Sequence, residues 1–322
     1  MKTAFITGIT GQDGSYLAEF LLKKKYKVVG LVSKKHNIGW ENVENLKKRV
    51  TFEDGDLLDK SSLEKVFKKY KISEVYNLAA LSFIPACWEK PQLAFDINAL
   101  GVLRLLEIIR DKSKKTRFYQ ASTSKIFGRS DKSSLNEKTP ILPKDPYSVS
   151  KAAAHFIVRA FRNQYSLFAV NGILFNHESP KRGPDFVTRK ITLGAASIKL
   201  GLQKKLELGN LKSKEDWGYA PDYVRAMWLM LQQDKPQDFV IGTGEAHSVG
   251  DICKIAFSTL GLDYKKYVIV DKKFFRRQTG KPIIADYSLA KKVLNWKPQV
   301  SFDKMIKMMV EKDYNYLKNS NS

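Results

Sequence analysis

Short apolar runs alternate with longer amphipathic stretches along the chain. Six apolar runs are predicted to form strands, at residues 3–7, 27–32, 50–57, 74–80, 117–122 and 239–244. Helical periodicity is predicted for residues 15–22, 100–110, 147 onward and 226–233. Such alternation is typical of a parallel sheet flanked by helices, whose strands are apolar throughout because both of their faces are covered. The polar end of the chain, residues 318–322, is expected to fray.

The first apolar run leads directly into a glycine-rich turn. Gly8, Gly11 and Gly14 follow the strand at residues 3–7, and helical periodicity begins at once. Gly8 permits the sharp turn, Gly11 lets backbone N–H groups approach a pyrophosphate, and Gly14 lets helix and strand pack closely. A glycine turn without a ligand is the alternative, which the strand–turn–helix context disfavours. We therefore predict an α/β protein with a Rossmann-like, doubly wound sheet of seven mostly parallel strands and a smaller C-terminal domain.

Composition limits the classes of function. The chain has 322 residues, 43% of them hydrophobic, enough for one large α/β domain or two interleaved ones. Its net charge of +23 is typical of nucleic-acid or membrane binders, but the lysines are scattered, so neither partner is expected. Cys87 and Cys253 are too few and too far apart for a disulfide framework or a zinc site, and no metal is expected. No apolar stretch approaches the ~20 residues that cross a bilayer, so a soluble, cytoplasmic protein is expected.

Candidate catalytic residues follow the fifth predicted strand. That strand ends in Ser122-Thr123-Ser124-Lys125, at the sheet edge where open α/β proteins bind their ligands. Tyr147 and Lys151 open a helix in the sequence YSVSK, and their four-residue spacing places both side chains on one helical face. A nearby ammonium favours a phenolate, so Lys151 is expected to lower the pKa of Tyr147. Tyrosine and lysine at this spacing are common by chance, but the glycine loop and the Ser-Thr strand end favour catalysis.

These motifs resemble those of the GDP-mannose 4,6-dehydratases, within the extended short-chain dehydrogenase/reductase family. The resemblance is carried by GITGQDGSYLAEFLL (8–22), by the strand end at Thr123, by YSVSK (147–151) and by GILFNHESPKRG (172–183). It covers almost the entire chain. It implies an NAD(P)-binding Rossmann domain and a smaller nucleotide-sugar-binding domain, formed respectively by residues 1–172 plus 218–246 and by residues 173–217 plus 247–322.

The resemblance also implies a dinucleotide cofactor. Ser33-Lys34-Lys35 follows the second strand, where NAD-dependent proteins usually carry an acidic residue that binds the ribose. The dehydratases have two arginines here, aligned with Ser33 and Lys34. Cations at this place suit a 2′-phosphate, so NADP is the expected cofactor and NAD is the alternative.

Individual roles follow from the resemblance. Catalytic roles fall on Thr123, Lys125, Tyr147 and Lys151. The cofactor is expected to contact Gly8, Gly11, Gln12, Asp13, Gly14, Lys34, Asp56, Leu57, Leu78, Ala79, Ala80, Tyr147, Lys151, His177 and Arg182. His177 is interpreted as a hydrogen-bonded structural histidine, because no metal partners accompany it. The sugar nucleotide is expected to contact Ser82, Asn176, Val187, Lys190, Gly209 and Arg276.

The resemblance further implies an assembly. The Lys181-Arg182-Gly183 loop corresponds to one that forms subunit contacts and reaches a neighbouring cofactor in the dehydratases. Two adjacent cations are also suited to phosphate. A homotetramer or a homodimer is therefore expected.

Four departures from the dehydratase pattern bear on the chemistry. Lys125 stands where the dehydratases have the Glu that removes the C5 proton, and Glu215 where they have an Arg that holds the diphosphate. Thr279 replaces a ribose-binding Glu, and Leu81 and Phe83 replace polar residues near the sugar. A protonated lysine cannot accept a proton, so elimination requires another base or a lowered lysine pKa. CDP-glucose 4,6-dehydratases and inverting UDP-N-acetylglucosamine dehydratases carry Asp-Lys at this place.

The leading hypothesis is a GDP-mannose 4,6-dehydratase-like lyase. It would oxidise C4 of a GDP-hexose, or a close GDP-sugar, with tightly bound NADP and eliminate water across C5 and C6. Tyr147 would take the O4 proton, Thr123 would hydrogen-bond O4, and Lys125 would take or relay the C5 proton. Because of Lys125, a GDP-sugar 4-dehydrogenase, reductase or epimerase that keeps the C6 hydroxyl is the alternative. A non-enzymatic binding protein is disfavoured, since Tyr147 and Lys151 would be idle.

Overall fold

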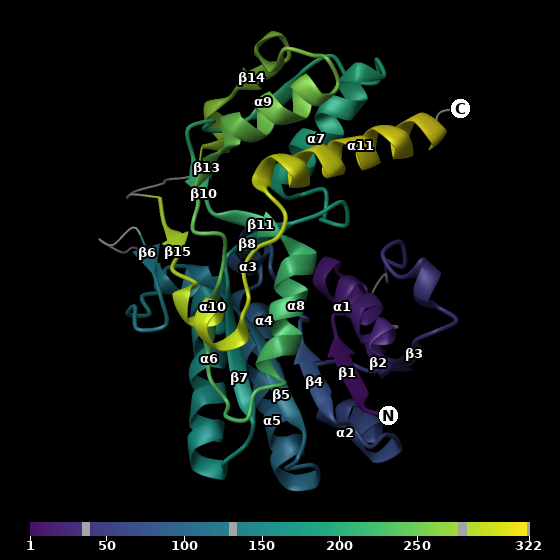
Figure 1. The fold of residues 1–322 in the computed structure, drawn as a ribbon, viewed down its shortest axis with the longest axis vertical. Helices are drawn as coiled ribbons and strands as arrows, with labels where there is room; N and C mark the ends of the chain where they lie inside the picture. The colour runs from purple at the N-terminus through teal and green to yellow at the C-terminus, as the bar shows by residue number, and fades with distance from the viewer. Residues whose placement is uncertain (34–38, 129–133, 276–281, 321–322) are drawn as a thin grey trace.

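A seven-stranded sheet forms the centre of the protein (Figure 1). The computed structural model describes residues 1–33, 39–128, 134–275 and 282–320. The strand order is β12-β7-β5-β4-β1-β2-β3, and every pair in this sheet is parallel, which confirms the expected Rossmann-like, doubly wound α/β fold. The strands are β1 (Thr3–Thr7), β2 (Lys27–Val32), β3 (Thr51–Asp54), β4 (Glu74–Asn77), β5 (Arg117–Thr123), β7 (Ala169–Leu174) and β12 (Phe239–Ile241).

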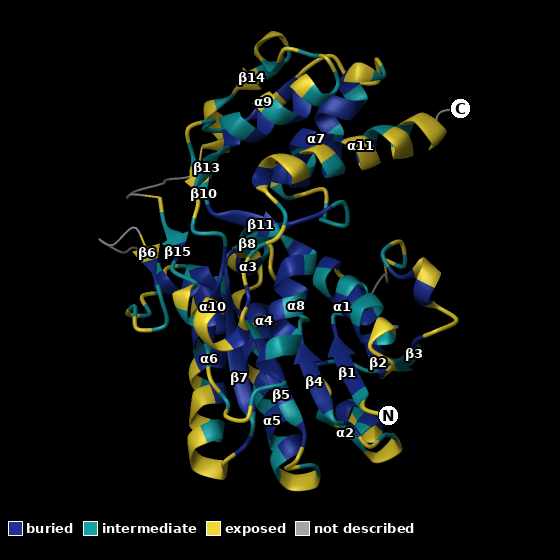
Figure 2. Cartoon of the chain, viewed as in Figure 1, coloured by how far each residue is buried: buried dark blue, intermediate teal, exposed yellow. Residues whose placement is uncertain are grey.

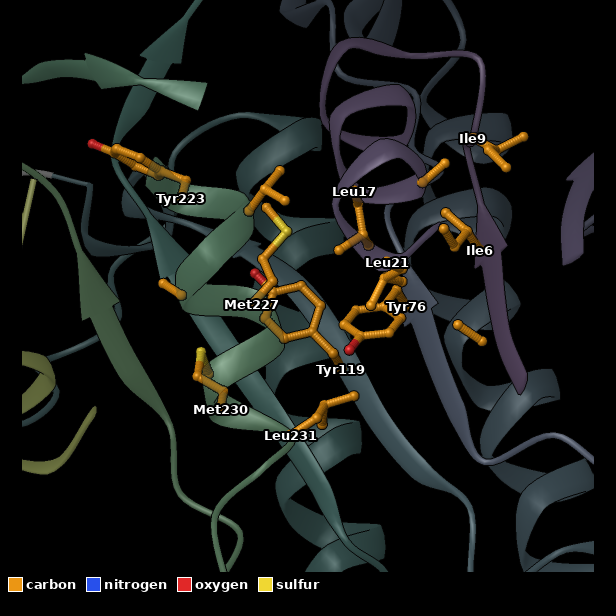
Figure 3. Packing of buried hydrophobic residues seen from close by; sticks show 14 of the residues in the cluster. Ile6, Ile9, Leu17, Leu21, Tyr76, Tyr119, Tyr223, Met227, Met230 and Leu231 are labelled. Atoms are coloured by element: carbon orange, nitrogen blue, oxygen red, sulfur yellow. The ribbon is translucent and has the colours of Figure 1, made fainter. Parts of the chain in front are cut away.

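Two layers of helices cover the sheet, because alternate residues of each strand point to opposite faces. On one face lie α1 (Gln12–Lys23), α8 (Ala220–Met230) and α10 (Ser288–Leu294). On the other lie α2 (Lys60–Lys69), α5 (Gly101–Lys112) and α6 (Pro146–Tyr165). Figure 2 shows the strands buried between these layers, and Figure 3 shows Leu17 and Leu21 of α1 beside Met227 of α8, over Tyr76 and Tyr119 of the sheet.

A second core lies beyond the carboxyl ends of the strands. Helices α7 (Val187–Lys199), α9 (Val249–Thr259) and α11 (Phe302–Ser320) pack together there, with β9 (Leu206–Leu208) and β14 (Val268–Val270) beside them (Figure 1). Two pairs of short strands join this part to the sheet. In one, β8 (Asn176–Glu178) runs parallel to β11 (Trp217–Tyr219), and in the other β10 (Lys214–Glu215) runs antiparallel to β13 (His247–Ser248).

One segment near the C-terminus packs against the sheet domain, although the sequence-based domain assignment placed it in the smaller domain. Residues 284–296 were assigned to the C-terminal part, but β15 (Ile284–Ala285) pairs with β6 (Ser134–Leu135), and Leu294 and Trp296 are buried in the core under α8 and α10. These apolar side chains complete the cover of the sheet. We propose that the rest of the division holds, with residues 1–172 plus 218–246 in one domain and the other segments in the second.

The structure corrects several element ends. Strand β4 stops at Asn77 instead of Ala80, because the next two N–H groups turn to Thr7 Oγ1. Helix α8 spans Ala220–Met230 instead of 226–233. Residues 318–320 continue helix α11, so the expected fraying is wrong there. The remaining short elements are η1 (Glu44–Leu46), α3 (Ile84–Glu89), α4 (Pro91–Phe95), the π-helical turn η2 (Asp96–Leu100), η3 (Ser124–Phe127), η4 (Tyr264–Lys266) and η5 (Lys272–Phe274).

Two features are absent from the described ranges. None of their helices is long and apolar enough to span a lipid bilayer. No group of three His, Cys, Asp or Glu residues among them is arranged to hold a metal ion.

Candidate active site

The glycine loop between β1 and α1 is closely packed at two of its three glycines. Gly8 has a φ of +69°, and a Cβ there would lie 2.7 Å from the Ala79 nitrogen. A Cβ on Gly14 would lie 2.2 Å from the Gly8 oxygen, whereas one on Gly11 would meet that oxygen at 3.3 Å. No described side chain caps the N-terminus of α1, so its first N–H groups face outward beside Gly11. This cradle fits the pyrophosphate of a dinucleotide.

Five predicted cofactor-contacting residues follow strands β3 and β4, at the same edge of the sheet as the glycine loop. Leu78 and Ala79 donate their N–H groups to Thr7 Oγ1 at 3.2 Å each, which holds them against the glycine loop. Leu57 is buried and packs against Gly101. Asp56 accepts a hydrogen bond of 3.1 Å from Ser33 Oγ, at the end of β2. Ala80 follows Ala79, and the predicted cation Lys34 lies outside the described residues.

His177 has both ring nitrogens against acceptors. Nε2 lies 2.7 Å from Asp13 Oδ2, and Nδ1 lies 2.7 Å from the Phe175 carbonyl oxygen. Nδ1 therefore donates to the carbonyl oxygen, and the Asp13 carboxylate favours a second proton on Nε2. Burial opposes that charge, but the charge and hydrogen bond of Asp13 outweigh it and raise the pKa of His177. The ring stacks on Tyr223 at 4.6 Å, so it joins the glycine loop to β8 and α8, as expected of a structural histidine.

The side chain of Gln12 is used within the fold. Its amide donates to the His177 carbonyl oxygen at 3.1 Å and accepts from Ser179 Oγ at 2.8 Å. Gln12 therefore offers a phosphate its backbone N–H, in the first turn of α1.

Thr123, Tyr147 and Lys151 meet at the carboxyl end of β5. Tyr147 and Lys151 lie one turn apart near the start of α6, which Asp145 caps, and Thr123 lies close enough to Tyr147 to favour its ionised form. Burial lowers the pKa of Lys151 to about 8, because that ammonium is only 3% exposed. Burial also raises the pKa of Tyr147 to about 12, against the opposing effects of Thr123 and the charge of Arg182. The expectation that Lys151 lowers the pKa of Tyr147 is therefore wrong for the protein alone: burial dominates.

Lys125 points to a carboxylate from another part of the chain. Its Nζ donates to both oxygens of Glu215, at 2.9 and 3.0 Å. Asn176 Nδ2 donates to Glu215 Oε2 at 3.1 Å. Lys125 follows β5, Asn176 follows β7 and Glu215 ends β10, so three segments converge beside Thr123. Sequence reasoning named all three residues but not their contact.

Three of the remaining predicted sugar-contacting residues, Val187, Lys190 and Gly209, lie on α7 or beside it. Lys190 Nζ donates to the Glu207 carbonyl oxygen at 2.9 Å and lies 4.5 Å from the centre of the Phe274 ring. A Cβ on Gly209 would lie 2.6 Å from the Phe274 oxygen, so Lys190 and Gly209 meet at one aromatic residue. Val187, at the start of α7, is 37% exposed. Ser82 is exposed in the loop after β4, and Arg276, like Thr279, lies outside the described residues.

The loop at 181–183 contacts its own chain. Lys181 Nζ lies 2.8 Å from Glu19 Oε1 and donates to the Asn42 carbonyl oxygen at 3.1 Å. The Arg182 guanidinium lies 3.5 Å from the centre of the Phe186 ring, and its charge acts on Tyr147 and Asp13. Arg182 thus lies near the site of its own chain.

Asn98 is a positioning residue whose role sequence reasoning did not identify. Its amide accepts from the Leu81 N–H at 2.9 Å and donates to Ser150 Oγ at 3.0 Å. It therefore fixes the loop after β4 to the helix that carries Tyr147 and Lys151. A buried Asn in a π-helical turn has no local sequence signal that would have revealed this.

Comparisons with known proteins agree with this arrangement. The profile of the family described as GDP-mannose 4,6 dehydratase matches residues 5–309. GDP-mannose 4,6 dehydratase 2 of Arabidopsis thaliana is 48% identical over 97% of this chain and 87% of its own length. The GDP-mannose 4,6 dehydratase of Dictyostelium discoideum is 43% identical over 99% of this chain and 97% of its own length.

The chain belongs to the GDP-mannose 4,6-dehydratase family. Its fold also matches the crystal structure of a dTDP-glucose 4,6-dehydratase from Bacillus anthracis in complex with NAD. The TM-score is 0.85, with 22% identity over 100% of this chain and 98% of the other.

Two departures from the pattern of the GDP-mannose 4,6-dehydratase family meet in one ion pair. Lys125 and Glu215 each carry the opposite charge to the residue expected from the family resemblance, and they bind each other. One change therefore balances the other in charge. Two residues, 90 positions apart in the sequence, both reverse the charge expected from the family. This double change is the sequence signal from which the contact could have been inferred.

Proposed function

We propose that this chain is an NADP-dependent enzyme that oxidises C4 of GDP-mannose, or a close GDP-sugar, and eliminates water across C5 and C6. The observation that carries the proposal is the meeting of Thr123, Tyr147 and Lys151 beside a glycine loop, in a chain 48% identical to a GDP-mannose 4,6 dehydratase. The position at the carboxyl ends of parallel strands supports it further.

The side chains at the end of β5 have complementary tasks in the oxidation. Tyr147 takes the proton of the sugar O4, and Thr123 hydrogen-bonds that oxygen, which fixes the sugar for proton transfer. Lys151, buried in the next turn of α6, provides an ammonium that stabilises the phenolate and holds the cofactor ribose. The ketone formed at C4 acidifies the C5 proton, and Lys125 lies at the same strand end to take or relay it.

The glycine loop is proposed to bind the cofactor. Its pyrophosphate fits beside Gly11 at the N-terminus of α1, with Asp13 and His177 fixed behind it. When bound, NADP would supply the hydride acceptor for C4 and the hydride donor for C6. The choice of NADP over NAD rests on the cations that follow β2 in the sequence, Lys34 and Lys35.

We also propose a homotetramer, or a homodimer, in which the loop at 181–183 lies at a subunit contact. The adjacent cations Lys181 and Arg182 support this assignment. Light scattering at micromolar concentration tests it, and a strict monomer would exclude it.

Mass spectrometry of the products tests the reaction. With GDP-mannose, the protein should form a product lighter by one water, and GDP-, CDP- and UDP-sugars offered separately should favour the GDP-sugars. Tyr147→Phe should slow product formation by at least about 100-fold, because the residue that takes the O4 proton is lost. Tyr165→Phe, at the exposed end of the same helix, is the matched control and should be unchanged.

The same mass spectrum distinguishes the alternative reaction, oxidation without loss of water, from the proposed elimination. A product that has lost two hydrogens and kept its C6 hydroxyl would identify a GDP-sugar 4-dehydrogenase. The specific observation that would explain this outcome is the Lys125 ammonium held by Glu215. Turnover by Tyr147→Phe at the parent rate would refute both readings.

A further inference from the structure

The Lys125–Glu215 pair is built into the site more firmly than a surface ion pair. The two side chains are 30% and 24% exposed, and Lys125 binds both carboxylate oxygens. Glu215 also accepts from Asn176, so three hydrogen bonds fix its orientation. Hydrogen bonds between two charged groups are stronger than those between neutral groups, and a partly shielded pair is screened less by solvent than an exposed one.

Both partners are anchored by backbone. Lys125 N donates to Thr123 Oγ1 at 3.2 Å, so the lysine begins one short turn from the threonine that lies close to Tyr147. Glu215 lies on β10, whose antiparallel pairing places it opposite His247 of β13. The pair therefore links the end of β5, two residues after Thr123, to β10 in the C-terminal part.

The pair holds a proton donor and a proton acceptor in contact. An ammonium has protons to give and no lone pair, whereas an ionised carboxylate has lone pairs and no proton. Moving one proton from Lys125 Nζ to Glu215 leaves a neutral amine and a neutral acid. The amine can then accept a proton that the ammonium could not.

We propose that Lys125 and Glu215 act as one proton-transfer unit in which Glu215, through Lys125, supplies the base for C5. This inference rests on the proposed function and identifies Glu215 as a positioning residue of that reaction. Lys125 is the group that faces the sugar, and Glu215 stores the proton that Lys125 releases. The hydrogen bond from Asn176 keeps the Glu215 carboxylate, which holds this proton, oriented towards Lys125.

The proton count of the step closes. Glu215 accepts a proton from Lys125, the Lys125 amine takes the C5 proton of the 4-keto sugar, and the electron pair of that C–H bond forms the C5–C6 double bond. The C6–O bond breaks, and the leaving hydroxyl receives a proton from the same unit, so water departs. The cofactor, when bound, would supply the hydride for C6, and C5 regains one proton, equivalent to the one that Tyr147 took from O4. The Lys125–Glu215 unit then holds one proton, as it did at the start, and no net oxidation occurs.

A single-turnover experiment in deuterated buffer separates oxidation from C5 proton transfer. The protein loaded with NADP is mixed with GDP-mannose; absorbance reports reduced cofactor, and mass spectrometry reports deuterium at C5. Glu215→Gln should keep cofactor reduction within about threefold but slow deuterium entry at C5 by at least about 100-fold. Lys125→Met should do the same, and the double variant should be no worse than either single variant, because residues that act as a unit are not additive.

Three further variants guard against a structural explanation. Glu215→Asp should recover part of the C5 exchange, and the swapped pair, Lys125→Glu with Glu215→Lys, should recover more, because the carboxylate then faces the sugar. The control is Glu107→Gln, which breaks the Lys60–Glu107 ion pair of 2.7 Å on α2 and α5 and should change neither signal.

If the parent protein reduces its cofactor but Glu215→Gln exchanges C5 as fast as the parent, this inference is overturned and the proposed function still stands. A parent protein that reduces no cofactor with GDP-mannose would overturn the proposed function and this inference with it.

Discussion

A single buried lysine shows how function and stability oppose each other. Lys151 is 3% exposed, and burial lowers its pKa from 10.5 to about 8. The unfolded chain therefore binds more protons than the folded protein between pH 8 and 10.5, and stability rises with pH across that interval. At pH 7 the folded protein holds a charged ammonium in an apolar place, which costs stability that catalysis requires.

Replacing that lysine should make the protein more stable and less active. We expect Lys151→Met to raise the free energy of unfolding at pH 7 by up to roughly 3 kcal/mol, with most of the gain lost near pH 10.5. Turnover should fall at least about 100-fold, because the phenolate of Tyr147 loses its cation. Urea unfolding at pH 7 and pH 10 and an activity assay measure both effects. Lys60→Met, at an exposed ion pair, is the control; a loss of stability in Lys151→Met at pH 7 would contradict the argument.

At the scale of elements, the sequence was sufficient where the signal is local. The glycine loop, the parallel strands and the start of α6 were predicted because apolar runs, glycines and the YSVSK spacing are properties of neighbouring residues. The end of β4 was not, because it depends on Thr7, 71 positions away, which takes the N–H of Leu78. The pKa of Tyr147 was predicted in the wrong direction for a similar reason: it depends on burial by distant elements.

The glycine loop makes a prediction that separates packing from binding. Gly14→Ala should destabilise the fold by at least about 2 kcal/mol, because its Cβ would lie 2.2 Å from backbone oxygen that cannot move alone. Gly11→Ala meets that oxygen at 3.3 Å and should change stability by less than about 1 kcal/mol. It should nevertheless weaken NADP binding about tenfold or more, since the methyl group fills the cradle. Urea unfolding and a fluorescence titration with NADP measure the two effects; equal binding by Gly11→Ala and the parent would show that the cofactor lies elsewhere.

The whole molecule is held together by contacts between distant segments, and these were the least predictable. Lys125 and Glu215 were both recognised as departures from the family pattern, yet their meeting depends on how β10 lies against the sheet edge. The position of α10 on the sheet likewise depends on Trp296, whose indole donates to the Asp222 carbonyl oxygen at 2.8 Å. Sequence spacing carries no information on such pairings unless two related changes are seen together.

The residue next to Glu215 provides a test at this scale. Asp216 is fully buried, and its carboxylate accepts from Thr243 Oγ1 at 2.7 Å, from Gly244 N at 2.9 Å and from Ala285 N at 3.0 Å. It therefore joins β10 and β11 to the loop after β12 and to β15, three segments far apart in the sequence. Asp216→Asn replaces one acceptor oxygen with a donor that faces other donors.

We expect Asp216→Asn to lower the free energy of unfolding by roughly 2–5 kcal/mol, because buried N–H groups lose their acceptor. The control, Asp263→Asn, changes an exposed carboxylate that caps η4 and should cost less than about 0.5 kcal/mol, since Asn caps as well as Asp. Urea unfolding of both variants and the parent at pH 7 gives the comparison. Because Asp216 fixes the strand that carries Glu215, the less stable variant should also show slower C5 exchange under conditions in which it is still folded. Asp216→Asn as stable as Asp263→Asn would mean that the three segments are held together by apolar packing alone.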